Sequence, residues 1–99
     1  MKLLTQEILK KLPADIKVIT KFFFPAGASS WYATEYDPIE RLFFGFANLG
    51  DDEMAELGYF SLEELEGIRH PRLPALRVER DKFWNPETSL ADVMSFKVR

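Results

Sequence analysis

Residues 31–36 and 42–47 follow the pattern of β-strands, in which successive side chains point to opposite faces of a sheet. Four of the six residues from 31 to 36 are Trp, Tyr or Thr, which favour pleated, half-buried surfaces. Between the two runs, Pro38 supplies the backbone angle of a type I turn, and the Asp37 carboxylate is placed to accept hydrogen bonds from the turn backbone. The pattern predicts two strands joined as a hairpin.

The alternation also assigns each side chain of the first strand to a face of the sheet. One face is expected to carry Trp31, Ala33 and Glu35, and the other Tyr32, Thr34 and Tyr36. We expect Trp31 to be a core anchor, covered by Leu65 or Ile68 of a later helix. Gly45, in the second strand, is interpreted as a packing or bulge position.

Three further runs complete the predicted sheet. Residues 16–24 alternate in polarity, residues 56–60 form a short run after an acidic loop, and residues 76–80 alternate after two prolines. Short connections make an antiparallel meander the simplest topology.

Helices are predicted at three places. Ser61 and Glu64 form a capping box, in which each side chain accepts from the backbone amide of the other residue, so a helix is expected over residues 62–69. Apolar residues spaced by four predict a helix over residues 3–12. A threonine followed by a serine predicts a capped helical turn within residues 88–94.

Together these elements predict one α+β domain over residues 1–99. Its centre is a four- to five-stranded, mainly antiparallel sheet (a meander) with one or two helices packed on one face. The chain has 99 residues, of which 46% are apolar and 14% aromatic, and it is long enough to bury a single core without disulfides or metal.

The chain contains no cysteine, which excludes a disulfide scaffold, a thiolate zinc site and a cysteine nucleophile. Polar residues interrupt the apolar start of the chain before it reaches the length of a signal peptide. The longest apolar cluster, at residues 22–24, is far shorter than the roughly 20 residues of a membrane-spanning helix. We expect a soluble, cytoplasmic protein.

Thirteen basic and sixteen acidic residues give a net charge of -3. Nucleic-acid-binding domains are usually basic, so direct binding to nucleic acid is not expected. The charges are separated along the chain, since residues 51–66 hold seven acids and no base, and residues 69–82 hold five bases. We expect a surface with two electrically different sides.

The candidate binding surface consists of residues from three stretches of the chain: Glu35, Tyr36, Asp37, Asp51, Asp52, Glu53, Arg80 and Asp81. Glu35 has two interpretations. If its face of the sheet is covered, the carboxylate loses hydration and becomes a candidate site. If the face is open, or if Glu35 pairs with an arginine such as Arg80, its role is structural, and this second interpretation is favoured.

The single histidine, His70, is interpreted as a surface loop residue, because a metal site would need further ligands and a catalytic base would need an orienting partner. The acidic run lacks the ligand spacing of a calcium loop. The chain also lacks the sequence patterns of serine hydrolases, zinc proteases, phosphate-binding loops and dinucleotide-binding folds. We therefore predict no enzymatic activity, no metal and no cofactor.

Several blocks of the chain resemble one family, DUF2958, and they extend over nearly its whole length. The blocks are LLT at residues 3–5, WYATEYD at 31–37, LFFG at 42–45, ELGYFSL at 56–62 and VERD at 78–81. The family usually has glycine before the proline where this chain has His70, so a tight-turn role is not carried over. The resemblance implies no activity. It implies a setting, because such genes are similar to residents of bacterial plasmids, prophages and integrative elements, often near antirestriction or DNA-transfer genes.

From this setting, the missing catalytic patterns and the two-sided charge, we expect an accessory protein of mobile DNA that binds a protein of bacterial or mobile-element origin. A sharper form of the expectation makes the partner a restriction or CRISPR defence system, blocked by the acidic side. The alternative is a small-ligand-binding protein or an enzyme that uses residues 35–37 with Arg80. A deep pocket lined by Glu35 would favour the alternative, and an exposed patch of low curvature would favour protein binding.

Overall fold

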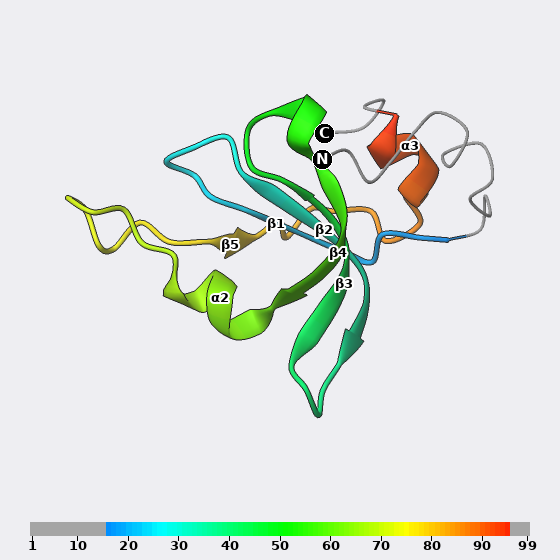
Figure 1. The fold of residues 1–99 in the computed structure, drawn as a ribbon, viewed down its shortest axis with the longest axis horizontal. Helices are drawn as coiled ribbons and strands as arrows, with labels where there is room; N and C mark the ends of the chain where they lie inside the picture. Colours follow the sequence, from blue (N-terminus) through cyan, green and yellow to red (C-terminus); the bar gives the residue numbers. More distant parts are fainter. Residues whose placement is uncertain (1–15, 96–99) are drawn as a thin grey trace.

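Five strands pair side by side in one antiparallel sheet, in the order β4-β3-β2-β1-β5 (Figure 1). The computed structural model describes residues 16–95, and the helix predicted over residues 3–12 lies outside this range. The strands are β1 (Thr20–Phe23), β2 (Ser30–Asp37), β3 (Leu42–Asn48), β4 (Glu56–Ser61) and β5 (Glu79–Arg80). The first four form the predicted meander and β5 returns to pair with β1, so the predicted α+β class is confirmed.

The helical elements are short: η1 (Asp52–Met54, a 3-10 turn), α2 (Leu62–Gly67) and α3 (Leu90–Met94). The Ser61 hydroxyl accepts a hydrogen bond from the Glu64 amide at 2.9 Å, which confirms the predicted helix start. Ser89 caps α3 in the same way, through the Asp92 amide at 3.1 Å. These caps determine the residues at which the two helices begin.

A β-bulge at Thr34 breaks the alternation of β2. Ala33 pairs with Gly45, but Glu35 pairs with Phe44, so Thr34 is the extra residue on its strand. The Thr34 hydroxyl donates to the Phe44 carbonyl at 2.9 Å, which stabilises the bulge. Residues after Thr34 therefore point to the face opposite to the one that strict alternation predicts.

The bulge corrects the predicted face of Glu35 and Tyr36. Residues paired directly across an antiparallel sheet lie on the same face. Tyr36 pairs with Phe43 and so lies on the face of Trp31, with its ring centroid 4.6 Å from that of Phe43. Glu35 lies instead on the face of Tyr32. The prediction that Glu35 shares a face with Trp31 was wrong, because the inserted Thr34 moves every later side chain of β2 to the opposite face of the sheet.

One face of the sheet, here called the α2 face, buries Trp31, Ala33, Phe60 and Leu65. Leu65 belongs to α2, and Ile68, just after this helix, packs against the same cluster. The Trp31 side chain is only 5% exposed, so its predicted role as a core anchor under Leu65 and Ile68 is confirmed.

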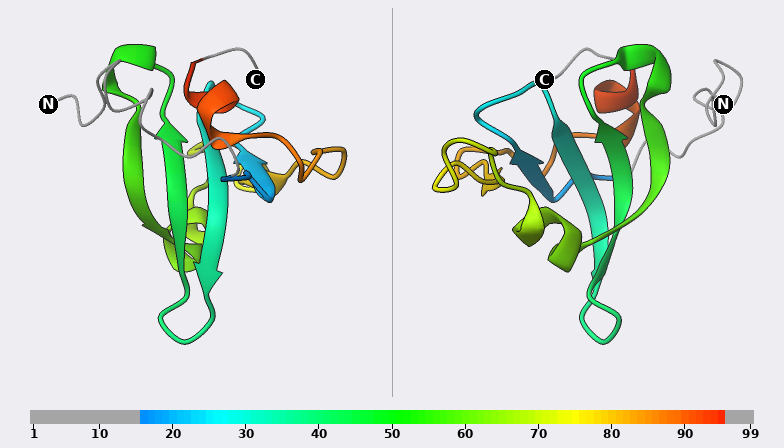
Figure 2. Two further views of the ribbon diagram at one scale, coloured as in Figure 1. Left: turned by 90° about the vertical axis from the view of Figure 1, so that its right-hand side faces the viewer. Right: turned by 60° about the vertical axis from the view of Figure 1, so that its left-hand side comes forward.

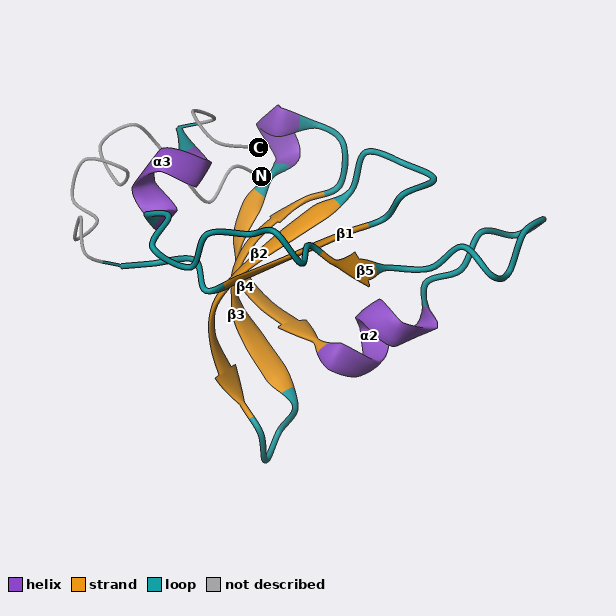
Figure 3. Ribbon diagram, turned by 180° about the vertical axis from the view of Figure 1, so that it is seen from behind, coloured by secondary structure: helices purple, strands orange, loops and turns teal. Residues whose placement is uncertain are grey.

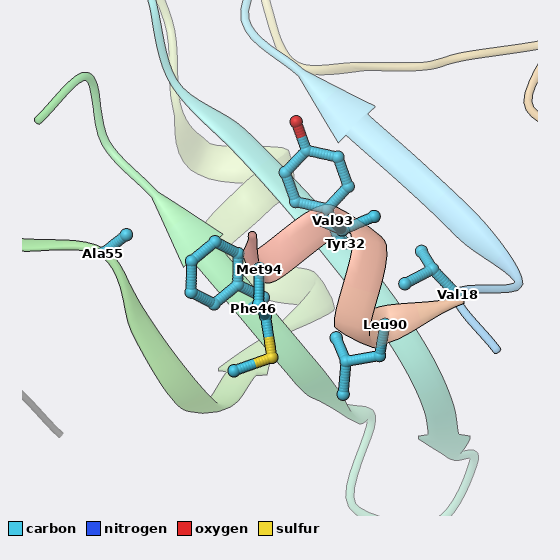
Figure 4. Packing of buried hydrophobic residues seen from close by; sticks show 7 residues of the cluster. All are labelled: Val18, Tyr32, Phe46, Ala55, Leu90, Val93 and Met94. Carbon is cyan, nitrogen blue, oxygen red and sulfur yellow. The ribbon is translucent and has the colours of Figure 1, made fainter. Parts of the chain in front are cut away.

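The opposite face, here called the α3 face, is covered at one end by α3. Figure 4 shows this cluster: Val18, Tyr32, Phe46, Ala55, Leu90, Val93 and Met94. The Val18 amide donates to the Thr88 carbonyl at 2.8 Å, which draws the chain before β1 toward α3. The Trp84 indole donates to the Val18 carbonyl at 2.7 Å and stands beside the Tyr32 ring.

The helix predicted over residues 62–69 packs on one face, as expected, and the helix predicted over residues 3–12 lies outside the described residues. α2 and α3 cover opposite faces of the sheet and lie at opposite ends of the molecule (Figure 3). The physical reason is that β2 has large aromatic side chains on both faces. Trp31 and Tyr32 point in opposite directions and each needs apolar cover.

Gly45 allows the bulged part of β2 to approach β3 closely. A Cβ atom at Gly45 would lie 1.9 Å from the Tyr32 carbonyl oxygen, and backbone cannot swing aside as a side chain can. Gly58, its partner in β4, has nothing within 4 Å of the same position. The interpretation of Gly45 as a packing or bulge position is confirmed.

Gly45→Ala should lower the free energy of unfolding by about 3 kcal/mol or more, because the new methyl group forces β2 away from β3. Gly58→Ala is the matched control and should change it by less than about 1 kcal/mol. Urea unfolding of both variants makes the comparison. Equal midpoints for the two variants would show that β2 and β3 do not approach each other this closely.

Trp31→Ala should cost about 3 to 5 kcal/mol of unfolding free energy, because it empties the centre of the α2 face. Tyr36→Ala should cost clearly less, because the Tyr36 side chain is 38% exposed at the end of the same face. Urea unfolding followed by circular dichroism measures both changes. A Trp31→Ala midpoint close to that of the native protein would mean that this ring is not part of the core.

Candidate functional site

Three of the candidate carboxylates shape the loops that carry them. Asp37 accepts hydrogen bonds from two backbone amides of the β2–β3 turn, at 2.9 and 3.2 Å, as the sequence predicted. Asp51 accepts from the amide two residues later at 3.0 Å, and Asp81 does the same at 2.9 Å. These contacts are the Asx turns that short acidic side chains favour.

The acidic candidates from 51 to 53 lie at the other end of the sheet from the β2–β3 turn (Figure 1). Asp51 caps η1, Glu53 is exposed, and of Asp52 only the backbone within η1 is described. Within residues 16–95, no three His, Cys, Asp or Glu side chains are placed to share a metal ion.

The sheet separates Glu35 from Arg80. Arg80 pairs with Phe22, which pairs with Trp31, so Arg80 lies at the β5 edge on the α2 face. Glu35 lies on the α3 face of the central hairpin. The structure therefore does not assemble the ligand site that would combine these two residues.

Ion pairs between side chains, within residues 16–95, join Arg41 to two carboxylates of α2. The Arg41 guanidinium lies 3.5 Å from Glu63 and 3.3 Å from Glu66. Arg41 has a φ of 57°, the left-handed conformation that closes the β2–β3 turn. The β2–β3 turn is thus connected through Arg41 to α2, from its first turn at Glu63 to its last at Glu66.

The part of the α3 face nearest the β2–β3 turn is open. α3 covers this face at Tyr32 and Phe46, and the hairpin continues beyond the helix (Figure 2). Leu42, Phe44 and Tyr59 extend the same face toward the turn, and we call them the distal patch. Tyr59 is 73% exposed, and its ring meets Phe44 edge to face with centroids 5.0 Å apart.

A surface hollow of about 420 Å³ lies over the distal patch and is also lined by residues 35–38. Glu35, Tyr36 and Asp37 are all exposed there. Three of the predicted site residues are thus brought together, as the rim of an aromatic surface. The arrangement offers flat apolar area for contact and two carboxylates for cationic groups.

A second hollow, of about 390 Å³, lies beside α2 and β5, and its lining is mostly basic: Glu66, Arg69, Arg77, Val78, Glu79, Arg80 and Lys82. The Arg69 guanidinium donates to the carbonyls of Glu66 and Ile68. This base therefore already binds backbone carbonyl groups at the C-terminal end of α2. The hollow gathers four of the five bases of residues 69–82, but Glu66, from the acidic run of residues 51–66, lines it as well.

His70 stabilises the loop after α2. Its Nδ1 atom accepts hydrogen bonds from the amides of Arg72 and Leu73, both at 3.1 Å. This local contact agrees with the interpretation of His70 as a loop residue.

The sequence did not predict the distal patch, because Phe44 and Phe46 have equivalent positions in the pattern of β3. Only the position of α3, which covers Phe46 and leaves Phe44 uncovered, distinguishes them. Tyr59 was not among the predicted site residues.

The fold and the patch define a small α+β protein with an antiparallel sheet that is open at one end of one face. A family model described as "Protein of unknown function (DUF2958)" matches residues 2–96. The chain belongs to the DUF2958 family, and the resemblance seen in the sequence is confirmed. No curated protein and no solved structure matches it. Within residues 16–95, every helix is too short or too polar to cross a membrane.

Proposed function

We propose that this protein is a binding module that holds another protein on the distal patch. The observation that carries the proposal is the exposed Tyr59 ring, which rests on Phe44 at the open end of the α3 face. Exposed aromatic side chains supply large contact area at little cost in conformational entropy, and they are enriched at protein interfaces.

The shape of the hollow supports a protein partner over a small ligand. Its volume falls within the range of ligand pockets, but such pockets bury most of a ligand's surface. Here Glu35, Asp37 and Tyr59 are exposed, so a small molecule would keep much of its own surface in water. A protein surface would cover the patch and its rim together.

The chemistry of the rim and the family context support the choice of partner. The Glu35 and Asp37 carboxylates suit a partner with lysine or arginine next to an apolar segment. The setting implied by the family resemblance favours a cytoplasmic partner of bacterial or mobile-element origin. In its sharper form, the proposal makes this partner a restriction or CRISPR defence component that is blocked by the acidic rim.

Tyr59→Ser should reduce recovery of a specific partner from a bacterial host by about tenfold or more, since it removes the central contact of the patch. Phe83→Ser is the matched control, because Phe83 is an aromatic residue that is 95% exposed and does not line the hollow over the distal patch. Affinity purification at physiological salt, with quantified recovery, measures both. Recovery of no specific protein, or equal recovery by both variants, would contradict the proposal.

The sharper form predicts that cells producing the protein resist loss of an incoming plasmid or phage to at least one restriction or CRISPR system. Glu35→Lys should abolish that protection, because it reverses a charge of the acidic rim. Transformation and plaque counts across several defence types measure the effect. Equal counts with and without the protein, in every defence background, would reject a defence component as the partner. The purification experiment would then still test whether the protein binds any partner.

A further inference from the structure

β4 is one outer strand of the sheet, and within residues 16–95 no strand pairs with its free side. Both views in Figure 2 place β4 at the border of the sheet. The other outer strand, β5, differs in kind: it consists of Glu79 and Arg80 alone. Short, charged outer strands are protected from pairing with other chains, whereas longer ones are open to it.

The hydrogen-bond ladder shows which backbone groups of β4 face outward. The Leu62 amide donates to the Arg41 carbonyl at 3.0 Å, which makes these two residues a hydrogen-bonded pair of the β3–β4 ladder. Such pairs alternate along an antiparallel ladder, so Phe60 directs its backbone groups toward β3. Leu57 and Tyr59 direct their amides and carbonyls away from the sheet.

Apart from the charge of Glu56 at its start, β4 lacks the sequence features that block an outer strand. Its pairing with β3 runs without a bulge from Glu56 to Ser61. The strand contains no proline and no lysine, and space beside Gly58 is open. The side chain of Tyr59, whose backbone faces outward, lies in the distal patch.

We propose that β4 receives an extended, basic segment of the partner protein as an added strand. The inference rests on the proposed function and deepens it, because it states how the partner is held. Backbone hydrogen bonds to Leu57 and Tyr59 provide the attachment, and alternate side chains of the added strand lie on the α3 face beside Leu57 and Tyr59.

The charge around β4 favours a basic segment. Glu35 and Asp37 line the hollow next to the strand, and Glu56 begins the strand itself. Glu56 pairs with Ala47 and so lies on the α2 face, where the lysine or arginine side chains that alternate with the apolar ones would meet it. Glu35 and Asp37 add to the negative potential of the surface from β2. A second copy of the chain is disfavoured at this edge, because it would bring the same acids together and because the chain carries a net charge of -3.

The test uses three pools of synthetic peptides of about eight residues, the length of an ordinary strand. Each pool alternates random β-branched or aromatic residues with lysine, with serine or with glutamate. The lysine pool should bind at least about tenfold more tightly than the glutamate pool, by fluorescence anisotropy. At saturation it should slow amide hydrogen exchange of Leu57 and Tyr59 at least about tenfold, while Phe60 changes little.

Two variants separate the backbone contact from the side-chain contact. Tyr59→Pro removes both the ring and the outward amide, and it leaves the β3–β4 ladder intact because that amide is not part of it. Tyr59→Ala removes the ring alone. The proline variant should bind the lysine pool at least about fivefold more weakly than the alanine variant. Unchanged exchange of Phe60 in both variants shows that the sheet is preserved.

Each other outcome overturns the inference. Resonance shifts at Phe44 without slowed exchange at Tyr59 would mean that the patch binds through side chains alone, which leaves the proposed function standing. Tightest binding by the glutamate pool, or binding by no pool, would reject the basic strand, and the purification experiment would then decide on the proposed function separately. Slowed exchange at Tyr59 that depends on protein concentration without peptide would identify a second copy as the occupant.

Discussion

The bulge at Thr34 determines what each face of the sheet presents. It directs the Tyr36 ring to the α2 face, beside Phe43, and the Glu35 carboxylate to the α3 face. The bulge requires close approach of β2 and β3, and this approach requires that residue 45 be glycine. Any larger side chain at position 45 would collide with the backbone of β2. The position of the Glu35 carboxylate on the distal surface therefore depends on a glycine at position 45.

The proposed binding surface is the part of the sheet that the helices leave uncovered. Both faces of β2 carry large rings, and within residues 16–95 one short helix packs against each face. α3 is only five residues long and covers Tyr32 and Phe46, so Phe44 and Tyr59 remain open beyond it. The same region contains the free edge of β4. Apolar area, acidic charge and free backbone groups thus occur together because a short helix covers a longer sheet.

Local signals were sufficient to predict most of the fold. The strands β2 and β3, the Asp37 turn and the Ser61 cap each depend on residues close in sequence, and each is present in the structure. The bulge was not predictable in this way, because β2 is aromatic on both faces and the inserted Thr34 leaves the polarity pattern unchanged. The open patch and the separation of Glu35 from Arg80 depend on how distant segments pack, which local patterns do not encode.

Nuclear Overhauser contacts of the Tyr36 ring test most directly whether Thr34 reverses the faces of β2. We expect contacts from the Tyr36 ring to Phe43, with Glu35 close to Phe44. Contacts from the Tyr36 ring to Phe44 and Tyr59 would contradict this expectation. They would mean that β2 alternates strictly and that the distal surface carries Tyr36 in place of the Glu35 carboxylate.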